Sequence, residues 1–364
     1  MILSLLNFPS HYRSNIYLKM EEELNSDFVF GNIANKSIKT VDFNKFKKKP
    51  ILLKTIKIFG SINYIKGSLK FCFKPYNKYL LTGEYYCISV WMILIINKLC
   101  KKKTYLWTHG YYGNEFFLKR IIKKIFFSLS DGIFLYGNYA RDIMIKEGFK
   151  SEKLHVIYNS LNYENQKLIR EKIKKTQVYE NKFQNTDPTI IFLGRLTKVK
   201  KVELFLNACS NLIKSGIHCN MVIVGDGDES ENLKSIINNL KLDSRCWFYG
   251  ATHDELVISE LIYNSTLCLS PGNIGLTAVH ALTYGTPVIT HSNLCDQMPE
   301  FEAIKSGVTG LFFKQNNIQD LLKKLIEALS AFKDKNETFK NCTSVIDAYY
   351  NPIYQIKIFK KILL

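Results

Sequence analysis

The chain has 364 residues, 46% of them hydrophobic, and carries 50 Lys and Arg against 32 Asp and Glu, a formal net charge of +18. This length exceeds the size at which one hydrophobic core usually stops growing, so we expect two domains. Nine cysteines are scattered without a Cys-x-x-Cys pair. They argue for reduced thiols in a cytosol and against a disulfide or zinc framework.

The N-terminal residues do not form a convincing secretion signal. Residues 1–6 lack a basic segment and a cleavage site. The longest apolar run, residues 85–96, is shorter than the roughly 20 residues that a membrane span needs. We therefore expect this run to form a buried helix.

Strands and helices alternate in the first half of the chain. Apolar, β-rich runs predict strands at residues 27–31, 78–82, 104–108, 132–136 and 155–158, with a helix at 85–99. His109 and Gly110 follow one of these buried strands, and Glu115 opens the next helix. His109 is our candidate for a catalytic residue, although it also fits a structural histidine bonded to a neighbouring carbonyl.

The excess positive charge is confined to this half. Residues 1–176 contain 31 Lys and Arg against 13 Asp and Glu, whereas residues 177–364 contain 19 of each. Such asymmetry suggests an anionic surface or substrate. Residues 114–131 predict a basic amphipathic helix, which fits either anionic lipid headgroups or a half-buried helix whose lysines face water. We expect no nucleic-acid partner, because zinc-finger, helix-turn-helix and RNP-type signatures are missing.

A polar, lysine-rich segment at 166–187 is the expected linker to the second half, where the alternation continues. Strands are predicted at 189–193, 221–224, 246–249, 266–269 and 285–290, and helices at 202–213, 233–240, 256–263 and 276–284. This order predicts a parallel, doubly wound sheet that binds its ligand at the carboxyl ends of the strands.

A basic pair follows the first strand of this half. Arg195 comes directly after Gly194, and Lys200 lies five residues further on. A diphosphate leaving group needs cations or backbone donors, and Arg195 offers a planar fork while Lys200 offers a mobile point charge. Gly275 opens the helix that begins near Leu276, whose free amides and positive dipole end favour a phosphate. The alternatives are two solvated surface cations and a plain turn before a helix.

Asp226 and Asp228 have a competing interpretation. An Asp-x-Asp pair after an apolar strand is able to hold a divalent cation against a diphosphate. The spacing is weak evidence, and a loop or helix-capping role is favoured over a metal site.

These residues resemble the GT-B-fold glycosyltransferases of family 4, the group 1 glycosyltransferases. Gly194-Arg195-Leu196 with Lys200 matches the family's first motif, and residues 270–289 match most of its second. Two departures stand out, because the family's paired glutamates, eight positions apart, are replaced by Gly272 and His280. In the family the first glutamate touches the donor sugar and the second touches the ribose.

The resemblance and the positions of the residues in the chain together suggest roles on both halves. The catalytic candidates are His109, Arg195 and Lys200. The donor-binding candidates are Gly194, Gly225, Asn273, Gly275, Leu276, Thr277, His280 and Glu300. The acceptor-side candidates are Gly110 and Arg13, and no residue is assigned to a metal. Arg13 belongs to residues 7–13, which stand in place of the glycine-rich loop that the family has after its first strand and that this chain lacks.

The resemblance also implies an α/β GT-B architecture, in which two Rossmann-like domains face each other across a cleft. The expected parts are a domain at 1–165, the linker at 166–187, a donor domain at 188–350, and a helix at 351–364 that returns to the first domain. The implied activity is retaining transfer of a sugar from a nucleoside diphosphate to a glycan or lipid-linked glycan, in bacterial-type surface polysaccharide assembly. It implies no cofactor and no metal, and a cytoplasmic protein, with a peripheral position on the inner face of the membrane as one option.

Two other functions fit the same residues. One is a sugar-nucleotide epimerase or a phosphorylase on the same fold. The other is a non-catalytic relic that binds a glycan or a nucleotide, which the loss of both glutamates supports.

Overall fold

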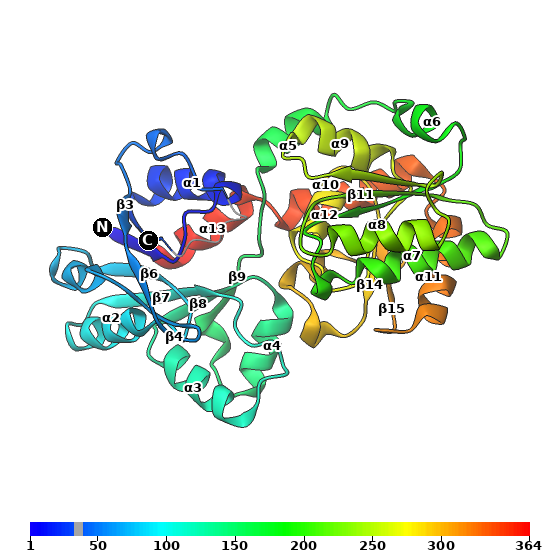
Figure 1. The fold of residues 1–364 in the computed structure, drawn as a ribbon. Coiled ribbons are helices and arrows are strands. Elements are labelled where there is room, and N and C mark those ends of the chain that lie inside the picture. The colour runs from blue at the N-terminus through cyan, green and yellow to red at the C-terminus, as the bar shows by residue number, and fades with distance from the viewer. Residues whose placement is uncertain (33–38) are drawn as a thin grey trace. The chain divides into compact units, whose positions relative to one another are not determined.

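Two parallel β-sheets with flanking helices make up the computed structural model, which describes residues 1–32 and 39–364 (Figure 1). The chain divides into an N-terminal unit, Met1–Asn162 with Asn351–Leu364, and a C-terminal unit, Tyr163–Tyr350. The predicted α/β class with parallel sheets is confirmed.

The N-terminal unit contains a seven-stranded parallel sheet in the order β3-β2-β1-β6-β7-β8-β9. Its strands are β1 (Ile2–Leu6), β2 (Ser26–Gly31), β3 (Ile51–Leu53), β6 (Lys78–Thr82), β7 (Lys103–Thr108), β8 (Gly132–Leu135) and β9 (Leu154–Val156). A separate antiparallel hairpin joins β4 (Thr55–Phe59) to β5 (Ile62–Ile65).

Helices cover both faces of this sheet, because alternate side chains of its strands point to opposite sides. The helices are α1 (Ser14–Leu24), α2 (Ile88–Leu99), α3 (Phe117–Ser128), α4 (Asn138–Lys146) and α13 (Pro352–Leu363). Leu6 packs in one core with residues of α1 and α13, whereas Leu5 packs in another with residues of α2 and α3. The rings of Trp107 and Phe359, 5.3 Å apart, join β7 to α13.

Helix α2 is not the fully buried helix that its apolar sequence predicted. Val90, Ile93 and Leu94 are buried against the sheet, but Ile95 and Leu99 are 47% and 80% exposed. An apolar run shows no polar face to mark its solvent side, so periodicity alone did not reveal that one side is uncovered.

The C-terminal unit contains a six-stranded parallel sheet in the order β12-β11-β10-β13-β14-β15. Its strands are β10 (Thr189–Leu193), β11 (Asn220–Val224), β12 (Cys246–Gly250), β13 (Leu267–Ser270), β14 (Val288–His291) and β15 (Gly310–Phe313). Its helices are α5 (Tyr163–Arg170), α6 (Val178–Phe183), α7 (Val202–Lys214), α8 (Ser230–Asn239), α9 (Glu255–Asn264), α10 (Leu276–Thr283), α11 (Ile318–Ala331) and α12 (Lys335–Tyr349).

The segment 166–187 was predicted as a linker, and this prediction is wrong. It lies within the C-terminal unit and contains most of α5 and all of α6. Arg170 donates two hydrogen bonds to the Asp347 carboxylate, at 2.8 and 2.9 Å, and the Tyr179 hydroxyl donates to the Leu261 carbonyl at 2.6 Å. These tertiary contacts hold short polar helices that have little stability of their own.

Within the part of the chain that the structure describes, none of the helices has the length and apolar character needed to cross a bilayer.

Candidate functional site

The first part of the site lies at the carboxyl edge of the C-terminal sheet. Gly194 and Gly225 follow the adjacent strands β10 and β11, and their loops touch closely. A Cβ atom on Gly225 would lie 1.9 Å from the Gly194 carbonyl oxygen, so only glycine fits there. Leu196 N donates to the Asp226 carbonyl at 2.9 Å, which extends the strand pairing into the loops. Arg195 is exposed between these contacts.

Lys200 is held against the loop that follows β13. Its Nζ donates to the Asn273 carbonyl at 2.7 Å. In return, Gly272 N donates to the Lys200 carbonyl at 3.1 Å, and Asn273 N donates to the Val199 carbonyl at 3.3 Å. Three hydrogen bonds therefore fix the Lys200 side chain and the backbone of residues 199–200 beside the start of α10.

The surroundings of Lys200 change the pKa of its side chain. Burial and the nearby Arg195 charge lower the pKa of Lys200 to about 8, and the Glu300 carboxylate acts in the opposite direction. Glu300 is 3% exposed in the short helix Pro299–Ala303. Two cations and one carboxylate thus lie near each other in the C-terminal unit, and the cations outnumber the carboxylate, as an anionic ligand requires.

The N-terminus of α10 adjoins this group. Gly275 precedes the helix, and its loop is anchored because Ile274 N donates to the Gln297 side chain at 2.7 Å. Leu276 and Thr277 form the first turn, whose backbone amides are the donors available to an anion. The Thr277 hydroxyl is already engaged, since it donates to the Leu193 carbonyl at 2.9 Å. The Asn273 Oδ1 atom is buried without a hydrogen-bond partner among the described residues.

Asp226 serves as a turn residue in the loop before α8. Its Oδ1 atom accepts hydrogen bonds from the Ser230 hydroxyl at 2.6 Å and from Gly227 N at 2.7 Å, and these bonds hold its pKa below the usual range. Among the residues that the structure describes, no group of three or more His, Cys, Asp or Glu side chains is arranged to hold a metal ion.

In the N-terminal unit, His109 follows β7 among aromatic rings. Its ring lies 4.7 Å from the Tyr136 ring and 6.1 Å from the Tyr112 ring. Burial, together with the charges of Arg13 and Lys123, lowers the pKa of His109 to about 3. The imidazole is therefore neutral at physiological pH, and a pKa this low makes it a weak base, which suits orientation of a substrate better than removal of a proton.

Arg13 lies near the same edge of the N-terminal sheet. Its guanidinium is 5.1 Å from the centre of the Trp107 ring and 5.3 Å from that of the Tyr136 ring, distances typical of cation–π contacts. The structure therefore places Arg13 near His109, since both side chains contact the Tyr136 ring, although β6 lies between β1 and β7 in the sheet.

A buried ion pair shapes the loop after His109. Lys123 is 4% exposed and donates to the Gly110 carbonyl at 2.8 Å and to the Glu115 carboxylate at 2.5 Å. Glu115 in turn accepts from the backbone of Tyr112 and Gly113. The predicted basic helix at 114–131 has lysines that face water, and for Lys123 this prediction is wrong. Its side chain points inward and bonds the Gly110 carbonyl and the Glu115 carboxylate.

Asn7 and Glu84 are two residues of the candidate site that the sequence did not predict. They follow the adjacent strands β1 and β6, and the Asn7 side-chain amide donates to the Glu84 carboxylate. Burial raises the pKa of Glu84, although Tyr86, Asn7 and Arg13 favour its ionised form. The order of the sheet reverses between β1 and β6, which is where open α/β sheets bind ligands. This signal becomes visible only once the strand order is known.

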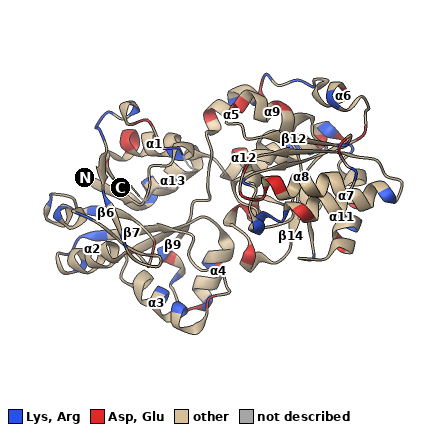
Figure 2. Cartoon of the chain, viewed as in Figure 1, with Lys and Arg blue, Asp and Glu red and all other residues tan. Residues whose placement is uncertain are grey.

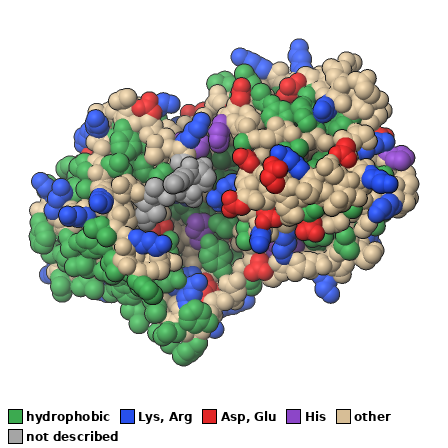
Figure 3. Space-filling model, in the orientation of Figure 1, with side chains coloured by type: hydrophobic (Ala, Val, Ile, Leu, Met, Phe, Trp, Pro, Cys, Tyr) green, Lys and Arg blue, Asp and Glu red, His purple; other side chains and the backbone are tan. Residues whose placement is uncertain are grey.

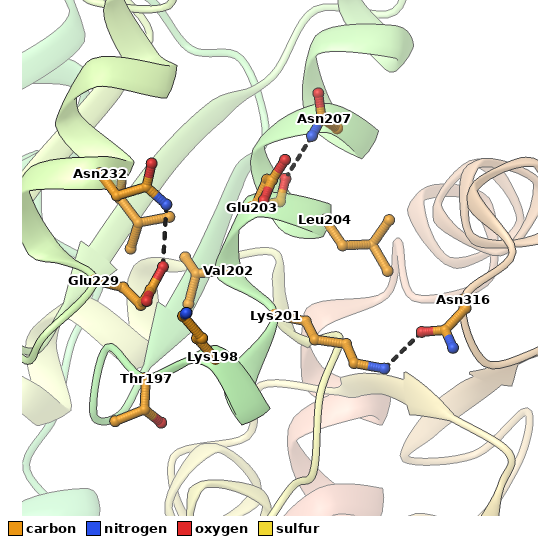
Figure 4. Close-up of a pocket in the computed structure, with 11 residues that line it drawn as sticks. Thr197, Lys198, Lys201, Val202, Glu203, Leu204, Asn207, Glu229, Asn232 and Asn316 are labelled. Carbon is orange, nitrogen blue, oxygen red and sulfur yellow. Dashed lines mark hydrogen bonds between the residues drawn. The ribbon is translucent and has the colours of Figure 1, made fainter.

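A cavity of about 480 Å³ lies on another side of the Lys200 loop (Figure 4). Lys198 and Lys201 line it together with Glu229 and Asn316, and Lys201 Nζ donates to Asn316 Oδ1 at 2.5 Å. None of the predicted donor-binding residues lines this cavity, so it is separate from the group around Arg195 and Lys200.

The residues of this arrangement lie in a segment that matches a known protein family. Residues 173–343, which include the Arg195 and Lys200 loops and α10, match the model of "Glycosyl transferases group 1". Residues 173–343 belong to the group 1 glycosyltransferases. The predicted family and the predicted enzyme class are thereby confirmed.

Relatives and solved structures extend the match beyond that segment. An uncharacterized 41.2 kDa protein in the cps region of Klebsiella pneumoniae is 26% identical over 81% of this chain and 71% of its own length. Alpha-monoglucosyldiacylglycerol synthase of Streptococcus pneumoniae is 27% identical over 57% of this chain and 46% of its own length. The Anabaena Alr3699/HepE structure in complex with UDP aligns over 99% of this chain and 98% of its own, with a TM-score of 0.72 at 15% identity. This likeness confirms the GT-B fold.

The chain has no room for a side chain at position 272, where the family's first glutamate is expected. A Cβ on Gly272 would lie 2.0 Å from the Val199 carbonyl oxygen and 2.6 Å from the Lys200 carbonyl carbon. Real Cβ contacts are never so short, so the backbone of 199–200 occupies the position that a side chain would take. The substitution at 272 and the loop conformation therefore depend on each other.

The second substituted position, His280, is tied into a polar cluster. His280 Nε2 lies 2.8 Å from Glu255 Oε1, which also accepts from the Tyr284 hydroxyl at 2.6 Å and from the Gln166 amide at 3.0 Å. Burial opposes ionisation, but these bonds hold the pKa of Glu255 below its usual range. One ring nitrogen of His280 thus has a partner within the C-terminal unit.

The lowered pKa of Lys200 predicts a specific pH dependence for the binding of a diphosphate beside it. Below about pH 8 the ammonium is charged and attracts a diphosphate, and above it the charge is lost, so affinity falls as pH rises. We expect UDP-glucose to bind up to about tenfold more weakly at pH 9 than at pH 7, because the protonated fraction falls by that factor. Titration calorimetry at both pH values measures this. The variant Lys200→Arg removes the dependence, and an equal decline in that variant would contradict the role of Lys200.

Gly272→Ala tests the contact between the loops. The added Cβ forces residues 199–200 away, so we expect a loss of stability of roughly 1–3 kcal/mol and weaker UDP binding. Gly216→Ala is the control, because its Cβ meets no atom within 4 Å and only its positive φ of 88° opposes the change. Thermal unfolding and UDP titration of both variants check this. Unchanged UDP affinity in Gly272→Ala would show that the contact does not position Lys200.

Proposed function

We propose that this glycosyltransferase moves a sugar from a nucleoside diphosphate, with UDP the favoured carrier, to a glycan or lipid-linked glycan, with retention of anomeric configuration. The arrangement of Arg195, Lys200 and the α10 N-terminus carries the proposal, because two cations and a row of free amides suit a diphosphate. The description of HepE in complex with UDP supports the choice of carrier.

The proposed reaction exchanges one bond at the anomeric carbon of the sugar for another. The bond from this carbon to the β-phosphate oxygen breaks, and the electron pair leaves with the nucleoside diphosphate. The acceptor hydroxyl bonds to the same carbon on the same face, and its proton passes to the departing phosphate. Arg195 and Lys200 stabilise the charge that develops on the phosphate. Neutral His109 orients a substrate hydroxyl.

The proposal includes no metal ion, since the cations near α10 supply the charge that a metal would otherwise provide. The acceptor class is proposed from the relatives. One lies in a cps region, and another is named as a synthase of a monoglucosyl lipid. We accordingly propose a role in surface polysaccharide or glycolipid assembly, at the inner face of a membrane, with residues 114–131 contributing to contact with anionic lipid.

A thermal-shift panel with UDP, GDP, ADP and CMP, each with and without EDTA, tests the donor site. We expect UDP to stabilise the protein most, by about 2.7 kcal/mol at one hundred times its dissociation constant, and the stabilisation to survive EDTA. Loss of the shift in EDTA would contradict the metal-independent site. No shift with any nucleotide would favour a relic that binds only a glycan.

A further inference from the structure

One face of the N-terminal unit exposes an unusual amount of apolar surface. The face comprises the β4–β5 hairpin, the short helix Ser68–Phe73, α2 and α3, all within residues 51–128, and is called the apolar face below. Hydrophobic side chains gather at the lower left of Figure 3, where Figure 1 places α2 and α3. A soluble monomer rarely leaves so many large apolar side chains in water without a function.

The exposed side chains follow helical stripes. On α2 they are Ile88, Met92, Ile95 and Leu99, which are 38%, 39%, 47% and 80% exposed. On α3 they are Phe117, Leu118, Ile121, Ile122 and Ile125, of which Phe117 reaches 77%. Each set recurs at spacings of three and four residues, so each forms one side of its helix.

Internal contacts join these elements into one surface. The rings of Trp91 on α2 and Phe126 on α3 lie 5.0 Å apart beneath the stripes. The hairpin is fixed to the start of α2, because Ile65 N donates to the Ser89 hydroxyl at 3.1 Å. On the hairpin, Ile58 is 56% and Phe59 is 80% exposed. The two stripes and the hairpin therefore belong to one packed framework.

The charges of residues 51–128 indicate which kind of partner binds the apolar face. Residues 51–128 contain 14 Lys and Arg but only two carboxylates, Glu84 and Glu115. Glu115 is paired with Lys123, and Glu84 accepts from Asn7. Lys57, Lys98 and Lys124 are exposed beside the apolar stripes, and Figure 2 shows further Lys and Arg along the loops near α2. Two carboxylates outside this range also pair with cations inside it, Asp131 with Lys103 and Glu147 with Arg120. Most of the other cations around the apolar side chains have no ion pair among the described residues.

We propose that the apolar face docks on an anionic lipid bilayer, with the two helical stripes in the acyl boundary and the lysines at the headgroups. A second copy of the chain fits poorly, because the same excess of cations would meet itself. Nucleic acid would leave the isoleucines and phenylalanines without a partner. This inference deepens the proposed function, since it places the enzyme where a lipid-linked acceptor would be found, and it replaces the single segment 114–131 with a larger surface.

Vesicle sedimentation tests the proposal directly. Wild-type protein is mixed with phosphatidylcholine vesicles that contain either no phosphatidylglycerol or about one third of it. We expect binding to the anionic vesicles, at least tenfold weaker binding to the neutral ones, and a decline in salt because the Debye length falls to roughly 3 Å at 1 M. Equal binding to both vesicles, or to neither, overturns the proposal.

Two variants locate the contact. Met92→Ser with Ile95→Ser and Leu99→Ser removes the α2 stripe, and we expect its affinity for anionic vesicles to fall at least tenfold. Leu256→Ser with Ile326→Ser is the matched control, because these side chains are 64% and 42% exposed on the C-terminal unit. Binding of the α2 variant equal to wild type overturns the two-helix face.

Two further measurements separate this proposal from its alternatives. UDP affinity of the α2 variant in solution should equal that of wild type, so loss of vesicle binding with intact UDP binding supports the docking face independently of the transfer reaction. If wild-type protein binds vesicles but no nucleotide, the proposed function fails while the docking face stands. Sedimentation equilibrium without lipid detects a dimer, and a dimer that the α2 variant abolishes would overturn the proposal in favour of a self-interface.

Discussion

The contact between the backbone of residues 199–200 and Gly272 is the constraint on which the arrangement around Lys200 depends. It brings the loop after β10 onto the loop after β13, two strands that are neighbours in the sheet. Lys200 is thereby held at a fixed distance from the first turn of α10 and is partly desolvated, which lowers its pKa. A side chain at 272 would separate the two loops. The glutamate that the family places there and this loop conformation therefore exclude each other.

The carboxyl edges of the two sheets carry different kinds of side chain. On the C-terminal sheet this edge carries Arg195, Lys200 and a helix N-terminus, which together favour an anion. On the N-terminal sheet it carries a neutral histidine, a guanidinium between aromatic rings, and the pair of Asn7 with Glu84. Such a mixture of donors, acceptors and ring faces suits a sugar better than a phosphate, because sugar hydroxyls both donate and accept hydrogen bonds.

Sequence patterns predicted two kinds of element correctly. One is the helix with a regular apolar stripe, and the other is the strand that is buried on both faces. The strand predicted at 189–193 is β10 itself, and the helix predicted at 202–213 differs from α7 by one residue. Features set by tertiary contacts were not found. Helices α5 and α6 are polar and short, and they depend on bonds such as that of Arg170 to Asp347. Lys123 resembles any lysine of a basic helix until the fold supplies Glu115 as its partner.

The same limit applies to the candidate site and to the membrane surface. Motifs identified Arg195, Lys200 and Gly275, because glycines and cations that directly follow buried parallel strands are typical of phosphate sites. They did not identify Asn7 and Glu84, which become neighbours only through the order of the sheet. An apolar helix gives the same pattern whether it packs on both sides or faces lipid, so only the exposure of residues such as Ile95 and Leu99 distinguishes α2 from a core helix.

The proposed mechanism requires that the Arg195 edge, and not the cavity lined by Lys198, binds the diphosphate. Calorimetric titration of UDP into wild-type protein and into the variants Arg195→Ala and Lys198→Ala, which each remove one cation from the same loop, tests this requirement most directly. We expect at least a tenfold loss of affinity for Arg195→Ala, equivalent to about 1.4 kcal/mol, and none for Lys198→Ala. A loss confined to Lys198→Ala, or an equal loss in both variants, would contradict the mechanism.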